Sequence, residues 1–225
     1  MQIDRLIRSK RKTVALIIER DGRLVVRAPQ HLSLPRIQSL VDAKAAWIEQ
    51  KRAQIETVQA AHPATAPKRY ENGESFAFLG AQYPLAIVPG ERPRLTFVKG
   101  KFLLTEAGVP HAERLFTAWY RRQARQICGE RSTAFARQMG VTYARIRISS
   151  ARTRWGSCSS RGTLSFTWRL VLMPQEIIDY VVVHELAHRC EPNHSPRFWA
   201  VVEQYMPDYK RRRAWLKKGG NDLAG

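Results

Sequence analysis

The spacing of hydrophobic and polar residues predicts short strands followed by a helix in the first quarter of the chain. Two runs of β-branched and aliphatic residues, 13–18 and 24–26, lie on either side of Asp21-Gly22. Such runs around Asp-Gly are typical of a β-hairpin. Residues 33–58 instead repeat apolar side chains at helical spacing. We therefore expect a hairpin followed by one helix near 33–58.

The pattern changes twice in the following part of the chain. Between residues 75 and 105, four short apolar runs alternate with Gly and Pro, which predicts an antiparallel β meander. From Pro110 to Met139, apolar residues recur at helical spacing opposite a row of arginines, and Gly140 follows. This stretch predicts a long helix that ends at the glycine. A basic helix face of this kind either binds a polyanion or is simply solvated.

Residues 143–173 contain three strand-like runs, with a turn predicted at Arg161-Gly162. Gly156 in the second run suggests a bulge or the close approach of another group to the backbone. Taken together, the elements predict an α+β protein. We expect a β-rich N-terminal region at 1–107 and a second domain at 108–225. The second domain combines an antiparallel sheet with the helix that carries the motif described next.

This helix contains the motif His-Glu-x-x-His. His184 and His188 are four residues apart, so both imidazoles lie on one face of the helix. His194 follows after a Pro-Asn pair, where the helix must stop and the chain can turn back. Three protein ligands and one open position are typical of a catalytic zinc site. We therefore expect Zn²⁺ on the three histidines, with Glu185 acting on the bound water as catalytic base.

Three further residues offer alternatives at this site. Glu203 is a rival third ligand, although the short connection to His194 favours the histidine. Cys190 is either a packing residue or a fourth, thiolate ligand, which would close the site and exclude hydrolysis. Asp179 either orients a ligand by a hydrogen bond or is a charge on the helix surface.

Hydrolysis of a peptide bond also requires a donor for the developing oxyanion. The candidates are Arg154, Tyr205 and Tyr209. We expect Arg154, Trp155 and Tyr205 to contact the substrate. An exposed edge strand of the 143–173 sheet would hold an extended peptide across the metal by backbone pairing.

Several segments resemble those of the YgjP-like metallopeptidase family. They are Arg154-Trp155-Gly156-Ser157-Cys158, Phe166-Thr167-Trp168-Arg169-Leu170, Pro174, Ile178-Asp179-Tyr180-Val181-Val182-Val183-His184-Glu185-Leu186-Ala187-His188 and Asn193-His194-Ser195-Pro196-Arg197-Phe198-Trp199. The family is similar to the WLM and Spartan-type proteases, which act on proteins crosslinked to DNA. The resemblance implies a zincin-like catalytic domain at 108–225, with the three histidines on zinc and Glu185 as base. The function expected is therefore that of a zinc metallopeptidase.

Composition adds partners and an alternative function. The 225 residues are 44% hydrophobic, enough for a packed core, and carry a formal net charge of +19. Besides a protein or peptide substrate, DNA or another polyanion is a plausible partner for the basic surface. The alternative function is a nucleic-acid-binding protein with a structural zinc site.

Cysteine usage and the absence of targeting signals indicate the compartment. Three cysteines without close pairing argue against a disulfide framework. The charged N-terminus is not a signal peptide, and no apolar run approaches the length of a transmembrane helix. We therefore expect no membrane partner and a cytoplasmic location.

Overall fold

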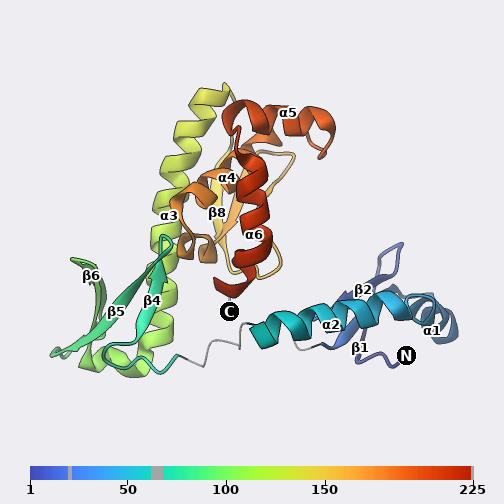
Figure 1. Cartoon of the computed structure of the whole chain (residues 1–225), viewed down its shortest axis with the longest axis horizontal. Helices are drawn as coiled ribbons and strands as arrows, with labels where there is room; N and C mark the ends of the chain where they lie inside the picture. The colour runs from blue at the N-terminus through green and yellow to red at the C-terminus, as the bar shows by residue number, and fades with distance from the viewer. Residues whose placement is uncertain (20–21, 62–67, 224–225) are drawn as a thin grey trace. The chain divides into compact units, whose positions relative to one another are not determined.

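The chain forms two compact units. The computed structural model describes residues 1–19, 22–61 and 68–223, and the units are Met1–Pro67 and Lys68–Gly225 (Figure 1). Each unit has a hydrophobic cluster of its own. Helices and strands are mixed along the chain, which confirms the α+β class. None of the described helices combines the length and apolarity needed to cross a membrane.

The N-terminal unit contains a three-stranded sheet. Its strands are β1 (Arg5–Ser9), β2 (Ala15–Ile18) and β3 (Leu24–Pro29), in the order β1-β3-β2. Strand β3 is antiparallel to β2, which confirms the predicted hairpin, and is parallel to β1. Gly22 in the turn has a φ of 79°, a conformation that glycine adopts without steric cost.

Two helices follow the sheet where the sequence predicts one. They are α1 (Leu34–Asp42) and α2 (Ala45–Ala61), so the single helix near 33–58 is wrong. The intervening residues, Ala43 and Lys44, are neither Gly nor Pro, and apolar periodicity continues across them. Both helices bury side chains in the cluster around β3, so tertiary packing, not a local breaker, accounts for the turn.

The C-terminal unit begins with four strands, β4 (Ser75–Phe78), β5 (Ala81–Val88), β6 (Leu95–Val98) and β7 (Lys101–Thr105). Their order is β4-β5-β7-β6, and β5 is parallel to β7. The predicted antiparallel meander is therefore wrong at this pair. Burial explains the order, because β7 carries the fully buried Phe102 and Leu104 and occupies a central position, which leaves β6 at the edge.

A 3-10 helix, η1 (Glu106–His111), leads into the long helix α3 (Ala112–Met139). Helix α3 ends as predicted at Gly140, whose φ of 64° is left-handed. Its Phe116 stacks on Phe76 of β4 with ring centroids 4.1 Å apart. The strands and α3 thus share one core, and the expected division between 107 and 108 lies inside the C-terminal unit.

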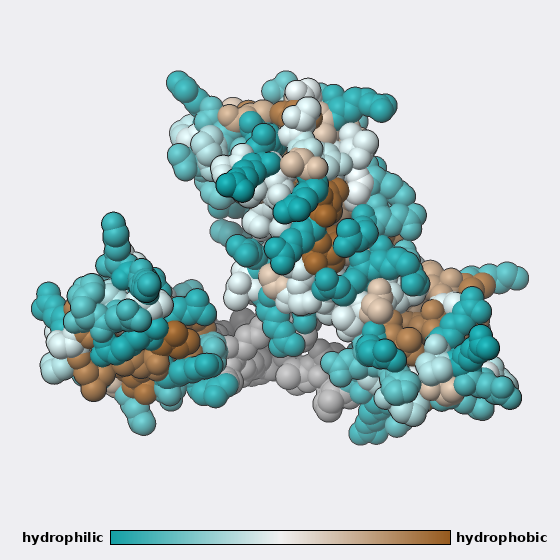
Figure 2. Space-filling model, turned by 180° about the vertical axis from the view of Figure 1, so that it is seen from behind, coloured by the Kyte–Doolittle hydropathy of each residue, from teal (hydrophilic) through white to brown (hydrophobic). Residues whose placement is uncertain are grey.

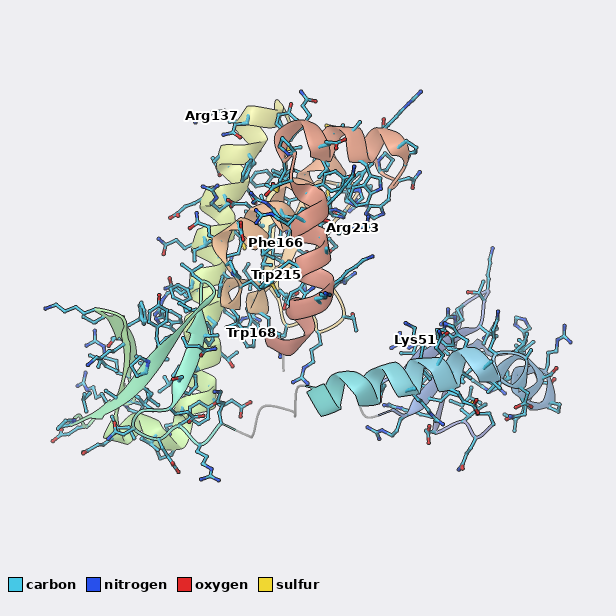
Figure 3. The ribbon with its side chains drawn as sticks, viewed as in Figure 1. Lys51, Arg137, Phe166, Trp168, Arg213 and Trp215 are labelled. Carbon is cyan, nitrogen blue, oxygen red and sulfur yellow. The ribbon has the colours of Figure 1, made fainter. Side chains whose placement is uncertain are left out.

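A second sheet of this unit consists of β8 (Arg145–Ser149), β9 (Gly156–Cys158) and β10 (Thr163–Thr167), in the order β8-β10-β9. Strand β10 is antiparallel to β9 and parallel to β8, so the antiparallel sheet expected here is in fact mixed. Strand β10 carries the fully buried Leu164 and Phe166, which explains its central place. Figure 3 labels Phe166 in the interior of the unit.

The remaining elements are η2 (Trp168–Leu172), α4 (Gln175–Ala187), α5 (Pro196–Tyr205) and α6 (Tyr209–Leu223). Strand β4 reaches η2 through the turn after it: the backbone N–H of Leu79 donates to the carbonyl of Val171 at 2.8 Å. Strand β9, α5 and α6 all pack against α4. Helix α4 is thus surrounded by other elements, and this position determines the geometry of the site it carries.

Candidate metal centre

Helix α4 places two histidines side by side. Most of its apolar residues, including Ile178 and Val182, are fully buried, which anchors the helix in the core. His184 lies in the last turn and His188 at the C-terminal cap. Their ring centroids are 5.2 Å apart. The spacing of four residues thus brings both imidazoles to one side of the helix.

The chain then reverses and returns a third histidine to the same point. The backbone N–H groups of Arg189 and Glu191 donate to carbonyls in the last turn of α4, at 2.8 and 2.9 Å, and form the turn. Ser195 caps α5, because its hydroxyl accepts a hydrogen bond from the backbone N–H of Phe198 at 3.3 Å. His194 lies directly before this cap, so the turn and the helix start together set its position.

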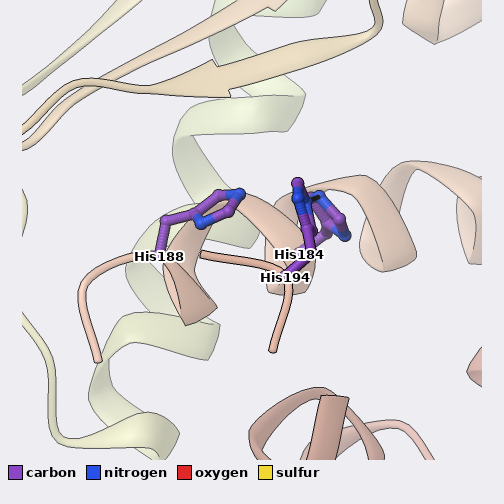
Figure 4. A group of neighbouring side chains, drawn as sticks. All are labelled: His184, His188 and His194. Carbon is purple, nitrogen blue, oxygen red and sulfur yellow. Dashed lines mark hydrogen bonds between the residues drawn. The ribbon is translucent and has the colours of Figure 1, made fainter. Parts of the chain in front are cut away.

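The three imidazoles converge (Figure 4). The potential ligand atoms of His184, His188 and His194 all lie within 4.8 Å of one another. The Nε2 atoms of His184 and His194 are 3.0 Å apart. At a tetrahedral zinc ion with Zn–N bonds of ~2.0–2.1 Å, neighbouring nitrogens lie about 3.3 Å apart. The donor set and its spacing therefore fit such an ion.

The surroundings of His184 and His188 favour their uncharged forms. Burial, together with the neighbouring His188, His194 and Arg213, lowers the pKa of His184 to about 3. Burial also lowers the pKa of His188. Nδ1 of His188 lies 3.3 Å from the carbonyl oxygen of Glu191. Since a carbonyl can only accept, Nδ1 carries the proton and Nε2 is left with a free lone pair for a metal.

Glu185 lies beside the cluster and not in it. Its side chain is 5% exposed. Burial raises the pKa of Glu185 to about 8, whereas the charge of Arg154 and a backbone hydrogen bond from Cys158 act in the opposite direction. A buried carboxyl group with a raised pKa is suited to holding and releasing a proton near neutral pH.

The close approach suggested for Gly156 is an approach of strand β9 to this carboxyl group. A Cβ added at Gly156 would lie 2.6 Å from Oε1 of Glu185 and 2.7 Å from its Cγ. Only a residue without a side chain leaves room for Glu185 at this position. The glycine was visible in the sequence, but its partner became apparent only from the packing of β9 on α4.

The rival ligands lie elsewhere. Among the residues that the structure describes, the group of His, Cys, Asp and Glu side chains around this point consists of the three histidines alone. Glu203 is exposed on α5 and pairs with Lys210 at 3.6 Å. Cys190 is exposed. Neither Glu203, the alternative third ligand, nor Cys190, the alternative fourth ligand, therefore lies at the histidine cluster.

Asp179 has a different partner from the one considered. Both its carboxylate oxygens accept hydrogen bonds from the guanidinium of Arg131, at 2.6 and 2.8 Å. This bidentate pair joins α4 to α3. The structure thus gives Asp179 a role in holding two helices together rather than in orienting a histidine.

A cavity of about 200 Å³ lies next to the histidines and is lined mainly by apolar groups. His184 and Glu185 contribute to its wall, together with the predicted substrate residue Trp155. Tyr180 also lines it, and burial raises the pKa of its hydroxyl to about 12. Tyr180 was missed in the sequence, although its position one turn before His184 was a signal that could have found it.

The remaining candidates for substrate contact and oxyanion donation do not line this apolar cavity. Arg154 is exposed but close enough for its charge to act on Glu185. Tyr205 is half-buried against the core and does not line the cavity. Tyr209 is buried and stacks on Trp199, with ring centroids 5.3 Å apart. The ring of Trp199 also lies under Arg213 of α6, which Figure 3 labels.

Three histidines at one point, with a buried carboxyl group next to them, define a candidate mononuclear metal site of the kind found in metallopeptidases. The chain belongs to the YgjP-like family: the family model, described as YgjP-like, metallopeptidase domain, matches residues 12–219. This membership confirms the resemblance seen in the sequence.

Among solved structures, the chain is similar to the metallopeptidase zymogen abylysin of Pyrococcus abyssi, with 23% identity and a TM-score of 0.37. The similarity covers 40% of this chain and 93% of abylysin. None of the curated proteins compared with the chain matches it.

Proposed function

We propose that the chain is a zinc-dependent metallopeptidase that hydrolyses peptide bonds, with a zincin-like catalytic domain in its C-terminal unit. The observation that carries the proposal is the convergence of three imidazoles beside the buried carboxyl group of Glu185. Family membership supports the peptidase class independently of this geometry.

Zinc is the ion that suits the proposed ligands. His184, His188 and His194 would hold it, and imidazole nitrogen is a common zinc ligand. When bound, zinc supplies Lewis acidity, which activates water and polarises a carbonyl group. Within the described residues no fourth side chain joins the three. An open position favours a catalytic site over the alternative, a structural zinc in a nucleic-acid-binding protein.

Glu185 is proposed as the catalytic base. Its carboxyl group takes the proton of the attacking water and passes it to the leaving amine. Burial supports this role, because it raises the proton affinity of the group. Gly156 supports it too, because the strand backbone confines the carboxyl group on one side.

Strand β9 is proposed to bind the substrate backbone. It forms one edge of the β8-β10-β9 sheet and packs on α4 over Glu185. An extended peptide would pair with this edge, as in other cases of strand addition. Trp155 and Tyr180 would contact a substrate side chain in the adjoining cavity. Tyr180 is the proposed donor to the oxyanion, since it lines the same cavity as Glu185.

Replacement of Glu185 tests the proposal. We expect Glu185→Gln to retain one zinc per chain and to lose casein cleavage by a factor of about 10² or more, because the base is removed while the ligands remain. Zinc would be measured by mass spectrometry of the purified protein, and cleavage by release of labelled peptides.

Glu203→Gln is the matched control, because the same change is made on the exposed face of α5. We expect it to keep both zinc and activity. Undiminished cleavage by Glu185→Gln would contradict the assigned base. Loss of zinc in Glu203→Gln would instead restore Glu203 as a ligand.

A further inference from the structure

The sheet that contains β9 has an open face with a distinct chemistry. Leu164 and Phe166 of β10 point into the core. The residue between them, Ser165, therefore lies on the opposite face. Ser165 is in register with Arg147 of β8 on one side and with Ser157 of β9 on the other. Arg147, Ser165 and Ser157 thus form a row across the open face of the sheet.

This row lines a cavity of about 170 Å³, which also receives Arg154 and which we call the basic cavity. No carboxylate belongs to its lining. Within the described parts of the chain, Arg147 and Arg154 form no salt bridge and the hydroxyls of Ser157 and Ser165 form no hydrogen bond, although the charge of Arg154 acts on Glu185. Two cations and two hydroxyl donors thus remain available to an anion.

The basic cavity lies directly across β9 from the metal centre. Trp155 and Gly156 line both the basic cavity and the apolar cavity beside Glu185. A peptide paired with the edge of β9 would direct successive side chains to opposite faces of the extended sheet. One side chain would enter the apolar cavity, and the next would lie over Ser157 and the two arginines.

We infer that the basic cavity binds an acidic side chain of the substrate, Asp or Glu, next to the residue that enters the apolar cavity. This inference rests on the proposed function, because it assumes a peptide along β9. A carboxylate fits the available donors, since guanidinium groups and hydroxyls are its usual partners. The basic cavity has room for about one side chain and lies beside the peptide-binding edge of β9. This arrangement favours a side chain of the peptide over a nucleic-acid backbone.

The test compares two fluorescent peptides that differ only by Glu or Gln at the position predicted to face the basic cavity. Binding is measured by anisotropy to the zinc-loaded full chain carrying Glu185→Gln, which should not cleave them. We expect the Glu peptide to bind about three- to tenfold more tightly. Adding Arg147→Gln should reduce this ratio to about one, whereas adding Arg145→Gln should leave it unchanged. Arg145 lies on the same strand but outside the lining.

Other outcomes would overturn the inference. Equal binding of the two peptides would do so. So would a preference that survives Arg147→Gln, or a single-stranded DNA oligonucleotide whose binding depends on Arg147 while the peptides bind equally. The binding result is independent of turnover. If the wild-type zinc protein cleaves neither casein nor the two peptides, the proposed function fails, and the Glu-to-Gln ratio still decides the role of the basic cavity.

Discussion

At the scale of single residues, the site depends on a contact between a glycine and a glutamate. Gly156 lies on β9 and Glu185 on α4, and the space between them excludes even a methyl group. The contact confines the carboxyl group next to the three histidines. Small displacements of a catalytic group have large effects on rate, so this contact should be measurable in kinetics.

Gly156→Ala should therefore impair catalysis without removing the metal. The added Cβ would lie 2.6 Å from Oε1 of Glu185, so the carboxyl group must move. We expect kcat to fall about 10²-fold while zinc content stays at the wild-type level. Steady-state kinetics and metal analysis would measure both quantities.

Gly129→Ala is the control for this substitution. Gly129 lies in α3, and an added Cβ there meets no atom within 4 Å. Alanine is the better helix former, so stability should rise by up to about 1 kcal/mol with activity unchanged. Full activity of Gly156→Ala would show that Glu185 can be displaced without consequence and would contradict its role as base.

The charge state of Glu185 should also affect the stability of the metal-free protein. Burial raises its pKa from the usual 4.5 to about 8, so the folded chain retains a proton that the unfolded chain releases. Its contribution to the free energy of unfolding is present below about pH 4.5 and is lost as the pH rises through about 8. His184 acts in the opposite window: its pKa is lowered from 6.5 to about 3, so its contribution is present above 6.5 and lost on acidification.

Metal-free Glu185→Gln should accordingly unfold at a higher temperature than the metal-free wild type at pH 8.5. The corresponding difference in the free energy of unfolding should be on the order of a few kcal/mol and should shrink toward pH 5. Thermal denaturation in chelator at several pH values would measure it. If the two unfolding temperatures differ by the same amount at every pH in this range, the result would argue against a raised pKa of Glu185.

At the scale of elements, helix α4, which carries His184 and His188, is held by its neighbours as well as by its own apolar face. Arg131 of α3 and Asp179 of α4 form a bidentate ion pair, with side chains 31% and 13% exposed. Arg121, which also lies on α3, donates a hydrogen bond to the backbone carbonyl of Ile148 at 2.9 Å. Part of the basic face predicted for α3 thus serves to join elements within the unit.

Asp179→Asn should weaken the α3–α4 contact and leave the metal in place. We expect a loss of about 1–2 kcal/mol in the free energy of unfolding, since the pair is only partly screened by solvent. Zinc content should not change, because Asp179 does not contact a histidine. Urea denaturation and metal analysis would test both statements.

Asp208→Asn provides the comparison for this change. Asp208 pairs with Arg211 and Arg212 at the exposed start of α6, where ion pairs contribute less. A larger loss of stability in Asp208→Asn than in Asp179→Asn would reverse this ranking. Loss of zinc in Asp179→Asn would return Asp179 to the metal centre.

At the scale of the whole molecule, the two units have separate cores and one of them contains the entire candidate site. The cluster of the N-terminal unit includes Leu24, Ile37 and Ile48, and shares no residue with the cluster around α4. Figure 2 shows one face of the molecule, on which hydrophilic residues predominate around several apolar patches. Hydrophilic cover of this kind agrees with the high content of charged residues, 25%.

Truncation should distinguish the unit boundary from the boundary expected in the sequence. A fragment of residues 68–225 should fold cooperatively and bind one zinc, because it retains the whole cluster around α4. A fragment of residues 108–225 should fail to do so, because it lacks Phe76 and Phe102, which pack on Phe116 of α3. Circular dichroism melts and zinc content would measure folding and binding. Cooperative folding of the shorter fragment would favour the division at 107 and 108.

The local elements could be predicted from the sequence wherever a local cause exists. The hairpin around Gly22 and the end of α3 at Gly140 each follow from the conformational preference of a glycine. The strand order could not be predicted, because β7 and β10 are central for a non-local reason: each carries two fully buried side chains. The break between α1 and α2 has the same kind of origin.

The same distinction between local and non-local causes applies to the candidate site. The sequence alone determined that His184 and His188 share a helix face, because a period of 3.6 residues requires it, and that His194 follows a turn. Only the tertiary structure decided that the turn returns His194 to the other two histidines and that Glu203 and Cys190 lie outside this cluster. It alone brought Gly156 against Glu185 and aligned Arg147 with Ser157. Helical periodicity is a property of the local backbone, whereas contacts between elements depend on how the whole core packs.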